Sequence, residues 1–127
     1  VRNLAEQAAA AASKVEARAE NAAKEIPEVV EGTKVYRVWG GKSGPWGESW
    51  TTVNPNSVSD FRSVAGLPDA NAGRFVSEGI LQSTEGVTAH GASVIKAGQQ
   101  GGLPELVIKN AEQKITLQRV SGVRPEF

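Results

Sequence analysis

The stretch Lys34-Val35-Tyr36-Arg37-Val38-Trp39, followed by Gly40-Gly41-Lys42-Ser43-Gly44-Pro45, decides the fold of this chain. Its first six residues are rich in β-branched and aromatic side chains, which favour a strand. The Gly- and Pro-rich residues that follow predict a loop. Ser49 to Val53 is again rich in β-branched and aromatic residues and predicts a second strand.

Short predicted helices and further strands fill the rest of the chain. Ser57-Val58-Ser59-Asp60 has the pattern of a capping box before a short helix, which Gly66 and Pro68 would end. A second short helix is predicted over residues 71–81. Three more strands are predicted at residues 87–95, 106–109 and 114–120, with a turn at 111–113. This order predicts an α+β fold with a mostly antiparallel sheet or two packed sheets.

Residues 1–30 are Ala-rich and differ from the remainder. Apolar residues recur every three or four positions from Leu4 to Ile26, which is the spacing of one helix face, and Pro27 ends the pattern. Because the stripe is mostly Ala, we interpret this segment as a linker helix, with a docking helix as the alternative. Residues 31–127 form the predicted domain. The chain starts at Val1 and contains no Met, so we expect a fragment of a longer protein.

Composition argues against several classes of function. The 14 Lys and Arg balance the 14 Asp and Glu, so the net charge is zero and nothing attracts nucleic acid or an anionic membrane at long range. No apolar run approaches the roughly 18 residues that span a bilayer. There is no Cys and one His, which excludes a disulfide framework, a zinc-thiolate site and a multi-His metal site.

Polar side chains within the first two predicted strands are candidates for a ligand site. Arg37 lies between apolar neighbours, so a buried guanidinium there must find a partner, and its planar fork suits a phosphate. The alternative is an edge-strand Arg paired with a surface carboxylate. Ser49 and Thr51 share one face of the second strand and can orient a neighbouring carboxylate. Alternatively, both hydroxyls face water while Trp50 enters the core.

Glu105 is the candidate catalytic carboxylate. It follows Gly101-Gly102-Leu103-Pro104 and opens an apolar strand, so the strand would fix it and the loop would admit substrate. The alternative is a solvated turn residue. His90 is expected to be structural or to lie on a strand surface, although a nuclease would use it together with Glu105. Gly40-Gly41-Lys42-Ser43 lacks the spacing of a phosphate-binding loop.

Taken together, Arg37, Ser49 and Glu105 resemble the Arg–Ser–Glu signature of ADP-ribosyltransferases. From about residue 35 to the C-terminus the chain is similar to the TreTu family, toxin domains found at the C-termini of Rhs polymorphic proteins. The strings that carry this resemblance are Val35-Tyr36-Arg37-Val38, Ser49-Trp50-Thr51-Thr52-Val53-Asn54-Pro55, Ala65-Gly66-Leu67-Pro68, Gly101-Gly102-Leu103-Pro104-Glu105 and Arg119-Val120-Ser121-Gly122-Val123.

The resemblance implies an ADP-ribosyltransferase-like fold of two packed sheets with a cleft for NAD as co-substrate and no metal. It implies that Arg37 contacts the NAD phosphates and that Ser49 and Thr51 brace the site. The backbone at Val38 would hold the nicotinamide amide. These residues would present NAD to the catalytic group in one pose.

Glu105 would then be the catalytic carboxylate, stabilising the positive charge that develops on the ribose as nicotinamide leaves. An aromatic ring, from Trp50 or Tyr36, would cover the nicotinamide. Leu103 stands where many family members that modify arginine carry Glu or Gln. This departure leaves the acceptor side chain open.

The resemblance also implies a biological setting. The target would be elongation factor Tu, so the toxin would block translation, and a cognate immunity protein would bind it in the producing cell. The Rhs connection implies type VI secretion into the cytoplasm of a competing bacterium. NAD hydrolysis without a protein acceptor, a ribonuclease toxin and a non-enzymatic interaction module are the alternatives.

Overall fold

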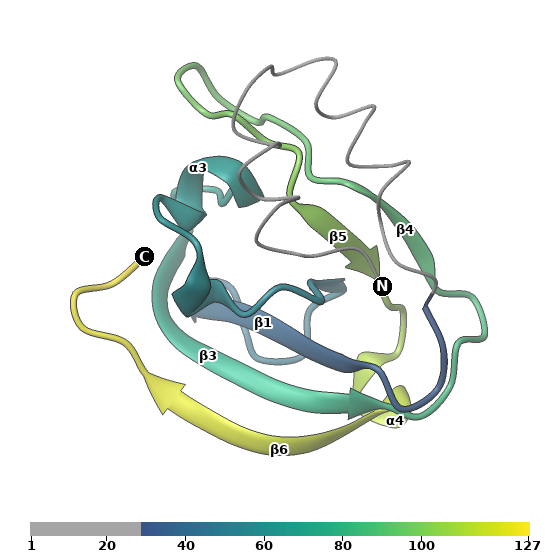
Figure 1. Cartoon of the computed structure of the whole chain (residues 1–127). Coiled ribbons are helices and arrows are strands. Elements are labelled where there is room, and N and C mark those ends of the chain that lie inside the picture. Colours follow the sequence, from purple (N-terminus) through teal and green to yellow (C-terminus); the bar gives the residue numbers. More distant parts are fainter. Residues whose placement is uncertain (1–28) are drawn as a thin grey trace.

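Two three-stranded antiparallel sheets form the framework of the protein, as the computed structural model of residues 29–127 shows (Figure 1). The long sheet has the order β1-β3-β6 and the short sheet the order β2-β5-β4. The long sheet consists of β1 (Lys34–Gly41), β3 (Asn71–Leu81) and β6 (Ile115–Gly122). The short sheet consists of β2 (Ser49–Trp50), β5 (Pro104–Val107) and β4 (Thr88–Gly91). The predicted α+β fold with two antiparallel sheets is confirmed, and the helix predicted within residues 1–30 falls almost wholly outside the described residues.

Residues 71–81 form a strand, so the helix predicted for them is wrong. β3 is the central strand of the long sheet and pairs antiparallel with β1 on one side and β6 on the other. The two ladders satisfy backbone groups that a helix would satisfy internally. A Cβ at Gly79 would lie 2.4 Å from Cγ2 of Ile115, so this glycine lets β6 approach closely. The short apolar pattern of this segment fits either a helix or a strand, and pairing on both sides decides between them.

The second predicted strand is shorter than expected. β2 ends at Trp50, and Thr51 makes an isolated bridge to Tyr36 of β1 through two backbone hydrogen bonds of 2.7 and 2.8 Å. The Thr51 hydroxyl then accepts a hydrogen bond from the Val53 N–H at 3.0 Å, which turns the chain away from the sheet. Residues 49–51 therefore join the short sheet to the long sheet.

A short helix follows, but its predicted capping box does not form. A 3-10 turn, η1 (Pro55–Ser57), comes first, and α3 (Phe61–Ala65) begins after Asp60, whose side chain makes no capping hydrogen bond. Asp60 adopts a left-handed conformation with φ 56°, which is unsuited to a capping box. The predicted stop at Gly66 is confirmed: its φ is 63°, and its N–H bonds carbonyls of the last turn.

The remaining predicted elements are present with shifted boundaries. The strand predicted at 114–120 is β6, and the strand predicted at 106–109 is β5, which begins two residues earlier. In the segment 87–95 only Thr88–Gly91 forms a strand. The turn predicted at 111–113 is a single helical turn, α4 (Ala111–Lys114). No helix among residues 29–127 is long and apolar enough to cross a membrane.

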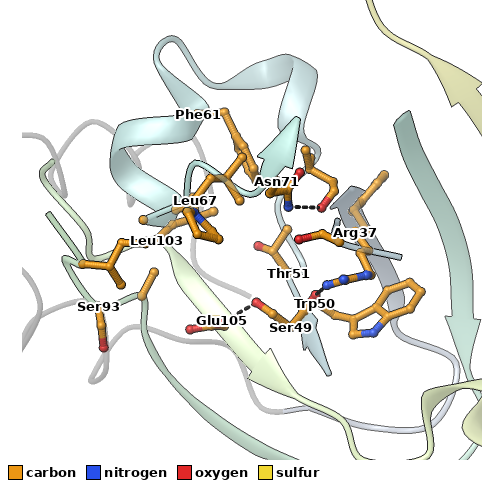
Figure 2. Close-up of a pocket in the computed structure, with 18 of the residues that line it drawn as sticks. Arg37, Ser49, Trp50, Thr51, Phe61, Leu67, Asn71, Ser93, Leu103 and Glu105 are labelled. Carbon is orange, nitrogen blue, oxygen red and sulfur yellow. Dashed lines mark hydrogen bonds between the residues drawn. The ribbon is translucent and has the colours of Figure 1, made fainter. Parts of the chain in front are cut away.

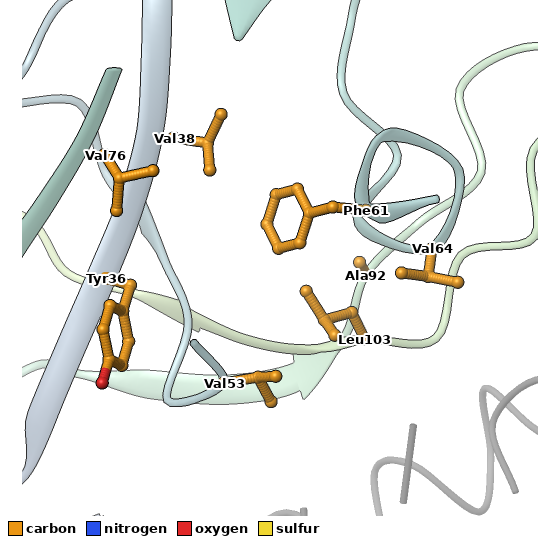
Figure 3. Close-up of a cluster of buried hydrophobic side chains, with 8 residues drawn as sticks. All are labelled: Tyr36, Val38, Val53, Phe61, Val64, Val76, Ala92 and Leu103. Carbon is orange, nitrogen blue, oxygen red and sulfur yellow. The ribbon is translucent and has the colours of Figure 1, made fainter. Parts of the chain in front are cut away.

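Two apolar clusters hold the sheets and α3 together. The first cluster lies between the long sheet and α3 (Figure 3) and contains Tyr36, Val38, Val53, Phe61, Val64, Val76, Ala92 and Leu103. The second cluster joins the two sheets and contains Val35, Trp50, Leu81, Leu106, Ile108, Ala111 and Ile115. Burying such side chains supplies the main favourable free energy of folding. β1 contributes to both clusters, so its position relative to β2 and β5 is fixed.

Candidate functional site

A cavity of about 540 Å³ opens between β1, the short sheet and α3 (Figure 2). Its wall contains every residue that the sequence assigned to the site, namely Tyr36, Arg37, Val38, Ser49, Trp50, Thr51 and Glu105. Arg37 lies toward one end, and apolar side chains such as Leu67 and Leu103 lie toward the other. The cavity therefore combines a polar end with an apolar end, as sites for small organic ligands commonly do.

The Arg37 guanidinium is buried at the polar end of this cavity. The residue is 8% exposed, and its Nε and Nη2 donate to the Gly44 carbonyl at 2.9 and 2.8 Å. Its Nη1 donates to the Ser49 carbonyl at 3.0 Å. Burial lowers the pKa of Arg37 from its usual value, because the charged form loses hydration. Within residues 29–127 no carboxylate lies within 4.0 Å of the guanidinium, so the expected alternative of a surface ion pair does not occur.

The loop after β1 is shaped around this guanidinium. A Cβ at Gly47 would lie 2.3 Å from Nη2 of Arg37, so only glycine allows the loop to cover it this closely. Gly44 has nothing within 4 Å of such a Cβ, although its carbonyl accepts two of the Arg37 hydrogen bonds. The carbonyls of Gly44 and Ser49 thus orient the guanidinium without neutralising its positive charge.

Glu105 lies on the central strand of the short sheet, and its side chain is 21% exposed. The Ser49 hydroxyl donates a hydrogen bond to Oε2 of Glu105 (Figure 2). Ser49 pairs with Val107 in the β2–β5 ladder, and Val107 is two residues from Glu105 on the same face of β5. The predicted role of Ser49 in orienting a carboxylate is therefore matched by a direct contact.

His90 also contacts Glu105, a pairing that the sequence suggested only for the nuclease alternative. It lies opposite Glu105 in the β4–β5 ladder, and its Nε2 lies 3.3 Å from Oε1. The predicted strand-surface position of His90 is correct, since its side chain is 43% exposed on β4. Only the pairing register could have revealed the contact, because a long loop separates the two residues in sequence.

The remaining predicted site residues line the cavity in different ways. The Trp50 ring is buried in the second cluster and donates to the Gly47 carbonyl at 2.8 Å, so it is a core residue. Tyr36 lines the cavity and is also buried in the first cluster, and burial followed by the charge of Glu78 raises its pKa. The carbonyl of Val38 accepts a hydrogen bond from Asn71 Nδ2 at 2.9 Å.

The apolar end of the cavity was not predicted from the sequence. Phe61 and Leu67 reach it from α3 and the turn that follows, and Leu103 and Ala92 reach it from the segments that flank the short sheet. A local signal existed for Phe61, which is the first apolar residue after the predicted cap. Assembly of the other three depends on tertiary packing. Residues 29–127 contain no cluster of three or more His, Asp or Glu that could hold a metal ion.

Comparison with known proteins gives no family assignment. No protein-family model matches the chain, and neither the curated proteins nor the solved structures contain a match.

Proposed function

We propose that residues 31–127 are an antibacterial toxin domain that transfers ADP-ribose from NAD to a protein. One arrangement carries this proposal: a carboxylate held by Ser49 shares one cavity wall with a buried guanidinium that has no carboxylate within 4.0 Å among residues 29–127. The resemblance of the Arg37, Ser49 and Glu105 segments to ADP-ribosyltransferases of the TreTu family agrees with it. The two antiparallel sheets are compatible with an ADP-ribosyltransferase-like fold.

Arg37 would bind the pyrophosphate of NAD. A guanidinium has five N–H donors. Three of them reach the Gly44 and Ser49 carbonyls, and within residues 29–127 the other two have no hydrogen-bond partner and could bind a ligand. A buried cation without a carboxylate nearby is costly unless an anion binds it, and phosphate oxygens match its fork geometry. The residues present therefore fit a dinucleotide phosphate at this end of the cavity.

Glu105 would stabilise the transition state at the ribose. Nicotinamide departs with the electron pair of the glycosidic bond, which leaves positive charge on the sugar. A carboxylate held by Ser49 is aimed before the reaction begins, so little reorganisation is needed as the charge develops. The Glu105 carboxylate, accepting a hydrogen bond from a ribose hydroxyl, would stabilise this charge, and Tyr36 would cover the nicotinamide ring.

The acceptor is proposed to be elongation factor Tu, so the modification would block translation. Leu103, two residues before Glu105, is 2% exposed and packs in the first cluster. It therefore offers no polar group to an acceptor side chain, and this chain would select its acceptor with other residues. Delivery into a target bacterium by type VI secretion and capture by an immunity protein are parts of the same proposal.

A ribonuclease is the second candidate, because His90 and Glu105 do lie together. In phosphoryl transfer the attacking and leaving oxygens lie roughly in line, so the general acid and general base act from opposite sides of the phosphorus. His90 and Glu105 are 3.3 Å apart and contact each other, which leaves no space between them for a phosphate. This geometry favours the transferase over the nuclease.

The decisive experiment incubates the chain with adenine-labelled NAD and a bacterial lysate. We expect one labelled band at elongation factor Tu, and loss of about 10²- to 10³-fold in the rate for Glu105→Gln, the range seen when a transition-state-stabilising group is removed. Glu78→Gln is the matched control, since Glu78 lies on β3 outside the cavity and pairs with Lys34 and Arg119. Nicotinamide release without a labelled protein would indicate hydrolysis, and no NAD turnover at all would refute the proposal.

The binding role of Arg37 is tested separately by Arg37→Lys. Lysine keeps the charge but cannot donate in a fixed fork to Gly44 and Ser49. We expect the KM for NAD to rise about tenfold, equivalent to about 1.4 kcal/mol, with a smaller change in kcat. Steady-state kinetics of nicotinamide release give both constants. An unchanged KM would remove Arg37 from the NAD site.

A further inference from the structure

The Glu105 carboxylate is held from two sides by neighbouring strands. β5 is the central strand of the short sheet, with β2 on one side and β4 on the other. Ser49 on β2 donates to Oε2 of Glu105, and His90 on β4 approaches Oε1 to 3.3 Å. Each carboxylate oxygen thus has its own partner, and a carboxylate held at both oxygens has less freedom to change rotamer.

The hydrogen bond made by Nδ1 of His90 determines whether Nε2 presents a proton or a lone pair to the Glu105 carboxylate. His90 Nδ1 lies 2.7 Å from the Gly91 carbonyl, and because a carbonyl can only accept, this contact is a hydrogen bond only when Nδ1 carries a proton. A neutral imidazole protonated at Nδ1 would present a lone pair to Oε1. The contact is therefore favourable only with a proton between Nε2 and Oε1. Among residues 29–127, Glu105 is the one carboxylate within 4.0 Å of His90.

We propose that His90 is a positioning residue that holds the Glu105 carboxylate, together with Ser49, in the orientation required to accept a hydrogen bond from the ribose of NAD. The reaction named in this proposal rests on the proposed function, whereas the effect on the Glu105 rotamer does not. His90 acts through Glu105 and is not placed against the substrate, since it lies outside the cavity wall. Its loss would therefore lower kcat while leaving NAD affinity nearly unchanged.

The test compares the parent with His90→Ala, His90→Gln and Thr88→Ala. A glutamine amide donates a hydrogen bond without needing a second proton, so His90→Gln tests rescue of the contact. Thr88→Ala is the control on the same strand, where Thr88 is exposed and pairs with Val107. Nicotinamide release gives kcat and KM, crystal structures without NAD give the Glu105 rotamer, and thermal unfolding shows that each variant is folded.

In His90→Ala we expect kcat to fall about tenfold with KM changed less than about twofold, and Glu105 to leave its parent rotamer. His90→Gln should restore the rotamer and most of kcat, and Thr88→Ala should match the parent. The positioning role is wrong if the parent turns over NAD and His90→Ala has the same kcat as the parent. It is also wrong if the kcat of His90→Gln falls as far as that of His90→Ala. In both cases the proposed function stands. If neither the parent nor any variant turns over NAD, the proposed function fails. Independently of turnover, an unchanged Glu105 rotamer in His90→Ala would overturn the role of His90.

Discussion

The long and short sheets differ in how their backbones and side chains are used. Strands of 8, 11 and 8 residues build the long sheet, whereas the short sheet has strands of 2, 4 and 4 residues. The long sheet contributes Arg37 to the site, and the short sheet contributes Ser49, His90 and Glu105. The carboxylate and its two partners therefore lie on the sheet with the shorter strands, which offer fewer positions for backbone hydrogen bonds between strands.

This difference implies that the short sheet is positioned mainly by side-chain packing. Its ladders are too short to be stable alone, and isolated short hairpins are marginal in water. Trp50 of β2 and Leu106 of β5 are both buried against Val35 of β1. Packing on the long sheet thus fixes the strand that carries Glu105, and stability and site geometry depend on the same cluster.

The largest expected effect on stability tests this dependence with Leu106→Ala. Leu106 is fully buried in the second cluster, so its truncation should reduce the free energy of unfolding by about 2–5 kcal/mol, from lost transfer energy and the cavity left behind. Leu117→Ala on β6 is the matched control, because Leu117 is 40% exposed and should change the free energy by less than about 1 kcal/mol. Urea denaturation measures both. Equal losses would mean that this cluster does not hold the two sheets together.

A smaller effect is expected from Gly47→Ala, which tests the loop joining the sheets. The added methyl group would lie 2.3–3.1 Å from Nη2, Cζ and Nη1 of Arg37, so the buried guanidinium would have to shift away from its hydrogen bonds to Gly44 and Ser49. The free energy of unfolding should fall by about 1–2 kcal/mol, and NAD turnover should fall about fivefold, close to 1 kcal/mol, because the displaced guanidinium no longer presents its free N–H groups.

Gly44→Ala is the control for this prediction, since a methyl group there meets nothing within 4 Å and the carbonyl that accepts from Arg37 is retained. Its turnover should equal that of the parent. Should both variants behave alike, the tight cover over Arg37 is irrelevant to the site.

The long sheet was only partly predictable from the sequence. β1 and β6 are recognisable because their β-branched residues and turn boundaries are local signals. β3 was predicted as a helix because its apolar residues also fit a helical face, and only its pairing with β1 and β6 settles its conformation. β2 is cut short by the bond between the Thr51 hydroxyl and the Val53 N–H, which composition does not reveal.

The site was more predictable in its polar residues than in their surroundings. Arg37, Ser49 and Glu105 were assigned to one site, and all three line one cavity. His90 was not assigned to it, because its register against Glu105 depends on the path of the intervening loop. The sequence allowed Trp50 either to enter the core or to contact the ligand. Its place in the core depends on packing against β1 and β5, which no local sequence pattern predicts.

The smallest expected effect concerns the exposed ion pair between Asp69 and Lys96. Asp69 precedes β3, and Lys96 lies in the loop between β4 and β5, with Nζ 2.5 Å from Oδ1. The hydrogen bond from Lys96, and next its charge, lower the pKa of Asp69. Asp69→Asn should lower the melting temperature by less than about 3 °C at neutral pH, because both side chains are well exposed to solvent.

The pH dependence of this small difference identifies its origin. A carboxyl whose pKa is lower in the folded state stabilises the fold above the ordinary value of about 3.9, and the contribution disappears as the pH falls through the folded-state pKa. The melting temperatures of parent and Asp69→Asn should therefore converge in acid, and also in about 1 M salt, which screens exposed charges. If the difference persists in acid, it arises from the amide substitution itself, and the ion pair does not connect the two sheets energetically. Convergence would mean instead that the charged pair weakly ties the segment before β3 to the loop between β4 and β5, in addition to the apolar packing that holds the short sheet in place.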